Sequence, residues 1–183
     1  MTEAEPLDVR HWPLSIDPFN KVLTFEFRHG PNDSDIWMVP LEGDRKPRPL
    51  LVRPYFQSHA VFSPNGKWLA YMSNEFVNLS TFGPQIFVEP YPSMGKKRQI
   101  TMEAGGAPLW SPDGMQLFYF WQPGIHVVDI QTEPQFSLGA TKLLRITGAL
   151  QATAQGENGQ APQSQINVVL NWVEELKQRV PVK

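Results

Sequence analysis

The hydrophobic residues of this chain occur in short runs, and turns rich in proline, glycine, asparagine and aspartate separate the runs. Segment 22–27 alternates between apolar and polar residues with a period near two, the period of a β-strand with one buried face. The 18 prolines and 13 glycines are spread almost evenly, which leaves little room for long helices before residue 165. We therefore predict an all-β chain. The expected strands are 22–27, 35–41, 60–63, 67–73, 85–89, 98–101, 108–111, 116–121, 125–130 and 142–144.

One segment of the chain occurs twice. Residues 62–71 read FSPNGKWLAY and residues 110–119 read WSPDGMQLFY, so that Pro64 and Pro112 lie 48 positions apart. In such a turn proline presets φ, asparagine or aspartate hydrogen-bonds to the backbone two residues further on, and glycine accepts a positive φ. The pattern therefore predicts the same hairpin corner in two successive sheets.

A third, more diverged copy precedes these two. Segment 15–21 stands where the others have Ser-Pro-Asn/Asp-Gly, and its Pro18 lies 46 positions before Pro64. Units of about 40–50 residues with four short strands cannot bury both of their faces alone, so they must stack on one another. We predict a partial β-propeller of about three four-stranded blades. The blades are expected at about 12–54, 55–103 and 104–146, with third strands anchored on Ile36, Ile86 and Ile125.

Three further segments flank the predicted blades. Residues 1–11 are expected to form an N-terminal tail, and residues 147–164 lose large apolar side chains almost completely, which is typical of a flexible linker. Residues 165–183 predict a strand followed by a short helix, because Asn171 and Glu174 have the spacing of a capping box. The sequence contains no signal peptide pattern and no apolar run near the ~20 residues of a membrane helix. The chain as written would be cytoplasmic, without membrane insertion, and the prediction leaves its localisation open.

Composition narrows the possible partners. With 16 basic and 18 acidic residues the net charge is −2, so no long-range field attracts nucleic acid or an anionic membrane. The absence of cysteine excludes disulfides, thiolate nucleophiles and cysteine-bound zinc, and it leaves the compartment open. We predict a protein partner rather than a nucleic acid.

No reaction motif is present. The sequence lacks a nucleophile elbow, a Walker loop, a zinc-protease motif, a dinucleotide-binding turn and a calcium loop. The histidines are scattered without a second ligand at metal spacing, and the aspartates considered for acid–base chemistry lie at turns or strand ends. These residues are His11, His29, His59 and His126, and Asp33, Asp35, Asp113 and Asp129. We predict no catalytic, cofactor-binding or metal-binding residue, no cofactor, and no enzyme activity of the chain itself.

Segments 62–74 and 110–120 resemble the Ser-Pro-Asp-Gly-(Lys)-x-Leu-Ala-Tyr signature of the TolB-like, or WD-like, propeller repeats of bacterial proteins. The order of features in residues 56–130 is similar to the C-terminal part of propellers that follow bacterial serine/threonine kinase domains or stand alone. The resemblance covers roughly residues 12–145 and 165–181. It implies a propeller, often periplasmic or extracytoplasmic, that acts as a binding platform and usually has six or more blades.

Two hypotheses for the function follow. The first is a non-catalytic binding or scaffolding module that mediates protein–protein interaction through the loops that join the blades. The alternative is a fragment of an enzyme-associated propeller, either the sensor domain of a bacterial serine/threonine kinase or the gating propeller of a prolyl-oligopeptidase-type peptidase. Three blades cannot close a ring, so we also expect a protein partner or self-association through uncovered blade faces.

Overall fold

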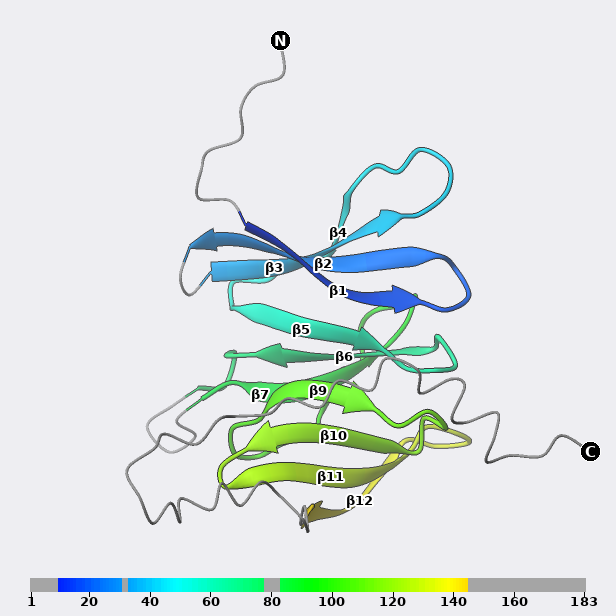
Figure 1. Cartoon of the computed structure of the whole chain (residues 1–183). Helices are drawn as coiled ribbons and strands as arrows, with labels where there is room; N and C mark the ends of the chain where they lie inside the picture. The colour runs from blue at the N-terminus through cyan, green and yellow to red at the C-terminus, as the bar shows by residue number, and fades with distance from the viewer. Residues whose placement is uncertain (1–9, 31–32, 78–82, 145–183) are drawn as a thin grey trace, which may run out of the picture. The chain divides into compact units, whose positions relative to one another are not determined.

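The structure is a computed structural model that describes residues 10–30, 33–77 and 83–144. Its regular structure in these residues consists of twelve β-strands without a helix, which confirms the all-β prediction (Figure 1). The strands are β1 (Arg10–Asp17), β2 (Val22–Gly30), β3 (Asp33–Pro40), β4 (Arg48–Leu51), β5 (Gln57–Phe62), β6 (Trp68–Ser73), β7 (Gln85–Pro90), β8 (Arg98–Gln99), β9 (Gly106–Trp110), β10 (Gln116–Trp121), β11 (Gly124–Gln131) and β12 (Ser137–Leu143).

The strands form three four-stranded antiparallel sheets in which strands adjacent in sequence are adjacent in space. We call β1–β4 blade 1, β5–β8 blade 2 and β9–β12 blade 3. The first strands β1, β5 and β9 lie side by side, one from each sheet, so the sheets stack in chain order (Figure 1). This arrangement is the predicted partial propeller.

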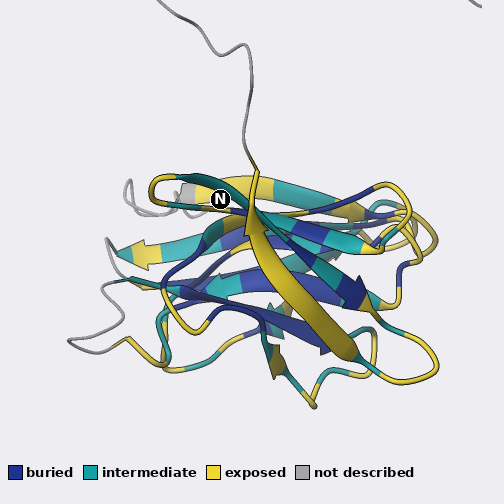
Figure 2. Cartoon of the chain, turned by 90° about the horizontal axis from the view of Figure 1, so that it is seen from below, coloured by how far each residue is buried: buried dark blue, intermediate teal, exposed yellow. Residues whose placement is uncertain are grey.

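The structure differs from the predicted strands mainly at sheet edges. β1, which begins at Arg10 inside the predicted tail, and β4 were not predicted. β12 starts at Ser137, five residues before the predicted strand, and is exposed along its whole length (Figure 2). Edge strands pair on one side only, so they tolerate proline and need no alternation of apolar and polar residues. The predicted linker, C-terminal strand and helix lie outside the described residues.

Equivalent residues of the three blades can be read from the strand pairing. On the second strands, Leu23, Leu69 and Leu117 are equivalent, and they pair with third-strand residues Val39, Glu89 and Val128. The predicted anchors Ile36, Ile86 and Ile125 pair with Glu26, Met72 and Phe120. The three sheets therefore share one register, although their sequences differ at most positions.

The turns β5–β6 and β9–β10 have the same hydrogen bonds. In the first, the Ser63 hydroxyl accepts from the Trp68 N–H at 3.0 Å, and Asn65 Oδ1 accepts from the Lys67 N–H at 3.0 Å. In the second, Ser111 and Asp113 accept in the same way from Gln116 and Met115, each at 2.9 Å. The glycines that close the turns, Gly66 and Gly114, have φ of 64° and 71°. Both segments therefore form the predicted corner.

Successive turns also touch one another. A Cβ atom on Gly66 would lie 2.7 Å from the Phe19 ring in the β1–β2 turn, whereas one on Gly114 would lie 3.6 Å from Pro64. Gly66 is thus required by its positive φ and by the approach of the neighbouring blade. The β1–β2 turn has a different closure, because its positive-φ residue is Lys21 and Asp17 accepts from the Phe19 N–H at 2.9 Å.

Two cores fill the spaces between the blades, and Figure 2 shows buried positions along the strands inside the stack. The core between blades 1 and 2 contains Ile36, Leu51, Ala60, Phe62, Leu69, Tyr71 and Phe87. The core between blades 2 and 3 contains Ala70, Ile86, Val88, Ile100, Trp110, Leu117, Tyr119, Val128 and Ile130. Blade 2 is therefore covered on both faces.

Candidate functional site

A cleft of about 460 Å³ opens where the first strands of the three blades meet. We call it the inner cleft. Its walls come from β1, β2, β5 and β9, so each blade contributes to it. Trp12 and Pro108 form apolar parts of the wall, and Glu26, Arg28 and His59 supply polar groups. A concave site with apolar walls and a few convergent polar groups is the usual form of a binding site.

The backbone of the cleft is irregular at three equivalent places, one in the first strand of each blade, and in β1 the pairing shifts register between Pro13 and Ser15. The pairing of β5 shifts register between Ser58 and Val61, and the pairing of β9 shifts opposite Phe118 and Phe120. His59 and Ala107, 48 positions apart, have φ of 52° and 48°. A β-bulge changes the direction of a side chain, and a positive φ costs free energy at a residue other than glycine. As a result His59 is exposed and faces the cleft, although its neighbours Ser58 and Ala60 are buried.

A buried carboxylate lies at the base of the cleft. Glu26 is 2% exposed, its Oε1 atom accepts from Arg28 Nε, and its Oε2 atom accepts from the Ser58 hydroxyl. Charged groups are rarely buried without partners because the loss of hydration costs several kcal/mol. The Arg28 side chain, 35% exposed, pairs with the Glu26 charge, so the base of the cleft is close to neutral.

The hydrogen-bond pattern determines the proton positions around His59. The Glu26 carboxylate can only accept, so the Ser58 hydroxyl must donate its single proton to it. The 2.7 Å contact between Ser58 Oγ and His59 Nδ1 then requires that His59 donates from Nδ1. The Nε2 atom of His59 is therefore an acceptor when the ring is neutral and a donor when the ring is protonated.

This arrangement differs from the one that activates a serine nucleophile. In such a site the imidazole lies between the hydroxyl and the carboxylate and removes the hydroxyl proton. Here the hydroxyl of Ser58 lies between Glu26 and His59, and Ser58 is 0% exposed. The geometry fixes the His59 ring at the cleft and does not deprotonate Ser58.

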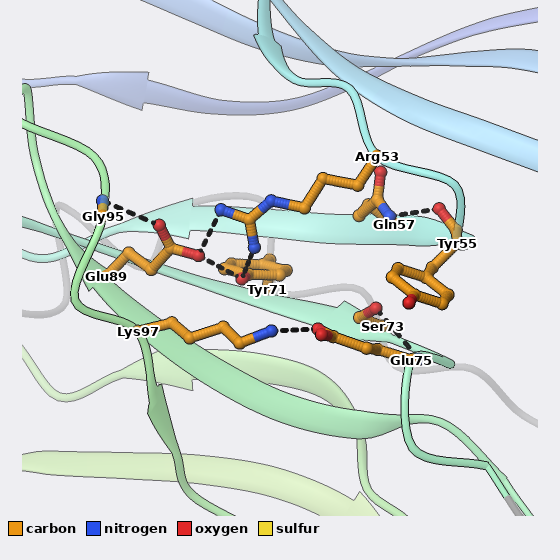
Figure 3. A network of polar contacts seen from close by, with 9 residues as sticks. All are labelled: Arg53, Tyr55, Gln57, Tyr71, Ser73, Glu75, Glu89, Gly95 and Lys97. Carbon is orange, nitrogen blue, oxygen red and sulfur yellow. Dashed lines mark hydrogen bonds and ion pairs between the residues drawn. The ribbon is translucent and has the colours of Figure 1, made fainter.

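A second polar network lies deeper between blades 1 and 2 (Figure 3). Arg53, in the connection from β4 to β5, donates to the Tyr71 oxygen at 2.9 Å and forms a 2.7 Å ion pair with Glu89 Oε1. Tyr71 donates to the same Glu89 oxygen at 2.5 Å, and the Gly95 N–H donates to Glu89 Oε2 at 3.1 Å. Glu89 is 0% exposed. The three side chains thus join the interblade connection to β6 and β7.

The electrostatics of this network favour its hydrogen-bonded form. Burial raises the pKa of Tyr71, and the bond to Glu89 raises it further, so the phenol stays protonated. Burial alone would lower the pKa of Arg53, but the nearby Tyr71 and Glu89 raise it overall. The network is structural, because its groups bind one another and do not line the inner cleft.

The four histidines that were considered as metal ligands lie apart from one another in the structure. His29 lies 3.0 Å from Asp35, His11 contacts the rings of Phe25 and Phe27, and His126 stacks on Tyr119. His59 alone among the four lines the inner cleft. Within residues 10–30, 33–77 and 83–144, no group of three or more His, Asp or Glu side chains could hold a metal ion. No helix in this part of the chain is long and apolar enough to cross a membrane.

The aspartates occupy the turn and strand-end positions that the sequence indicates. The Ser111 hydroxyl and the Met115 N–H hydrogen-bond to Asp113 and lower the pKa of its carboxyl group. Gln116 and Lys142 lower the pKa of Asp129 in the same manner. Asp113 is therefore an acceptor that closes the β9–β10 turn, whereas Asp129 joins β11 to β10 and β12.

Sequence reasoning did not identify the residues of the inner cleft. Glu26 interrupts the inward-facing positions Val22 and Thr24 of β2, and a charge on the buried side of an alternating strand is a signal that could have identified it. Ser58 and His59 precede the predicted strand 60–63, and the bulge that exposes His59 depends on the partner strand.

Comparisons with known proteins bear on the fold. No protein-family model and no curated protein matches this chain. Among solved structures, a putative TolB from Agrobacterium tumefaciens is 14% identical, with a TM-score of 0.55 over 73% of this chain and 50% of that chain. A puromycin hydrolase S511A mutant complexed with PGG is 19% identical, with a TM-score of 0.49 over 66% of this chain and 22% of that chain. The chain thus spans about half the length of the TolB structure, and that likeness confirms the TolB-like propeller fold.

Proposed function

We propose that this propeller module is a non-catalytic binding module that holds a segment of a protein partner in the inner cleft. The observation that carries the proposal is the exposed His59 on a bulged innermost strand, oriented by the buried Ser58 and Glu26. Backbone strain outside glycine is retained where the surrounding structure holds it, and it is frequently associated with binding sites.

The chemistry of the cleft suggests what it binds. Trp12 is 53% exposed and offers a large apolar surface. Arg28 offers N–H donors, and His59 offers its Nε2 atom, an acceptor on the neutral ring and a donor on the protonated one, whereas the carboxylate of Glu26 already accepts two hydrogen bonds. The partner segment should therefore carry an apolar side chain next to a carboxylate or carbonyl acceptor.

The order of groups around Ser58 supports a binding role over nucleophilic chemistry, because the serine proton is directed to Glu26. The alternative, a fragment of an enzyme-associated propeller, stays a prediction. It concerns residues outside this chain, and the cleft would then contact the enzyme part.

The test is a selection from a phage-displayed library of random peptides on the immobilised full chain. His59→Gly is the informative variant, because glycine accepts the positive φ while the imidazole is removed. Lys21→Gly is its matched control, since it also places glycine at a positive φ but lies outside the inner cleft. Selected peptides should lose roughly tenfold or more in affinity with His59→Gly and with Trp12→Ala, as contacts central to an interface do.

Affinity for the same peptides should be unchanged with Lys21→Gly. Selected peptides that bind His59→Gly and Trp12→Ala as tightly as the unmodified chain would show that the inner cleft is not the binding site. A library that yields no specific peptide would contradict the proposal as well.

A further inference from the structure

Each blade has two faces that can be compared across the chain. The leading face carries Leu and an aromatic residue two positions later on the second strand, and it faces the preceding blade. These pairs are Leu23 and Phe25, Leu69 and Tyr71, and Leu117 and Tyr119. In blades 2 and 3 these four residues are between 0% and 7% exposed. In blade 1 the equivalent Leu23 and Phe25 are only half-buried, because no described strand covers them.

The leading face of blade 1 is more apolar than that of blade 2. Val39 takes the place of Glu89, and Trp37 takes the place of Phe87. Aromatic contacts extend across it, since the Phe27 ring lies 5.5 Å from Trp37 and 5.0 Å from His11. The polar groups at its margin, His29 and Asp35, already lie 3.0 Å apart and contact one another within the chain. The leading face of blade 1 therefore has the apolar residues that are buried in blades 2 and 3, but no described blade covers it.

The trailing face is the opposite side of each blade and faces the following one. In blade 2 it carries Ala70, Ile86 and Val88, all 0% exposed beneath blade 3. In blade 3 the equivalent positions are Phe118, Ile125 and Val127, which are only half-buried. Two neighbouring residues on this face are strongly exposed, Phe120 at 54% and Leu109 at 62%. Contiguous exposed apolar surface of this kind marks an interaction site.

We propose that a second copy of this chain covers these faces, with the leading face of blade 1 on the trailing face of blade 3 of the other copy. The two interfaces within the chain support this contact, because in each of them the leading face of one blade packs on the trailing face of the preceding blade. The proposed contact continues that stacking with the one leading face and the one trailing face that the described blades leave open. The charges beside the trailing face, Asp129 and Lys142, are paired within the chain, so they do not repel the partner.

The contact is head-to-tail, and its geometry limits the number of copies. A head-to-tail contact closes into a ring only when the rotations add to a full turn. This chain matches 50% of the TolB chain, so a second copy would supply about as much propeller again. We therefore infer a dimer with two equivalent contacts. It concerns surfaces other than the inner cleft and is independent of the proposed function.

The experiment measures the mass of the full chain by light scattering and sedimentation equilibrium. The expected mass is twice the 20.8 kDa of one chain. Phe120→Lys should raise the dissociation constant of the dimer by roughly 100-fold or more, because a lysine ammonium would be buried without a partner. His11→Glu should do the same from the leading face, since His11 is exposed and contacts Phe25 and Phe27. Met102→Lys, at a residue 79% exposed outside both faces, is the control.

Mixing the two variants tests the head-to-tail order. Between them, a His11→Glu chain and a Phe120→Lys chain keep one leading face and one trailing face intact. The second contact then holds one added negative and one added positive charge at the same interface. The mixture should therefore dimerise at least about tenfold more tightly than either variant alone. A Phe120→Lys chain that dimerises normally would overturn the head-to-tail contact, and an unmodified chain that stays a monomer at all concentrations would overturn the second copy. Peptide binding by monomeric Phe120→Lys would leave the proposed function unaffected.

Discussion

The interface between blades 1 and 2 and the interface between blades 2 and 3 are built from equivalent positions but with different chemistry. In the first, Tyr71 and Glu89 face blade 1 and bind Arg53. In the second, the equivalent of Tyr71 is Tyr119, which stacks on His126 with ring centroids 5.3 Å apart, and the equivalent of Glu89 is Val128. The second core is otherwise aliphatic and aromatic.

The difference shows two ways to hold successive blades together. The hydrophobic effect between apolar surfaces has no preferred direction, so an apolar interface tolerates small shifts between the sheets. A buried ionic network requires its partners in place, because a displaced charge loses both its water and its counter-charge. The polar interface therefore fixes how blade 1 sits on blade 2, and the inner cleft with its buried Glu26 is formed at that same junction.

The largest effect should come from removing the network at Glu89. Glu89→Val gives blade 2 the residue that blade 3 has at this position, and it leaves Arg53 and Tyr71 without their acceptor. The free energy of unfolding should fall by about 3–5 kcal/mol, the usual cost of an unpaired buried charge. Urea denaturation of the full chain measures it. The double variant with Arg53→Met should recover most of the loss, and a double variant as unstable as Glu89→Val would show that the charge is not the cause.

A smaller effect should distinguish the two turns. Gly66→Ala places a methyl group against Phe19 of the neighbouring blade at a positive φ, so we expect a loss of about 2–4 kcal/mol. Gly114→Ala meets only an ordinary contact with Pro64, so its cost should be the backbone term of about 1–2 kcal/mol. Thermal and urea unfolding of the pair provide the comparison. Equal losses would mean that the turns of blades 1 and 2 do not press on one another.

The smallest effect should be the pH dependence of the free energy of unfolding that comes from Asp113 in the β9–β10 turn. The Ser111 hydroxyl and the Met115 N–H lower the pKa of Asp113 in the folded chain, so the unfolded chain binds the proton more tightly. The stabilisation is present above the ordinary aspartate pKa and is lost as the pH falls below about 4. Asp113→Asn should remove this acid-dependent part, and Asn65→Asp should add one at the equivalent corner. Unfolding measured between neutral and acidic pH checks both, and parallel pH profiles of all three chains would contradict it.

The parts of the fold that the sequence predicted are those set by local chemistry. Pro64 and Gly66 form their turn with adjacent residues of the sequence, and the apolar strand β6 begins directly after this turn. Strands β1 and β4 and the start of β12 could not be predicted in this way, because edge strands with exposed positions need no hydrophobic alternation.

The inner cleft escaped prediction for a related reason. His59 faces the cleft because β5 shifts its register against β6, and a register shift is a property of two strands. Arg53 lies in a connection, where a charged residue is unremarkable until its partner Glu89 is known. The functional assignment depends on such distant pairs, whereas the blade count depends on local repeats.

For the proposed binding of a partner segment, the bulges at His59 and Ala107 have a consequence for selectivity. A bulged first strand cannot form a regular row of backbone hydrogen bonds with an added peptide strand. The affinity for a bound segment must therefore come from the side chains that line the inner cleft. Substitution of a few of these side chains would then change which segment binds, while the hairpins that carry them keep their structure. A family of such scaffolds would diversify its guests without any rearrangement of its sheets.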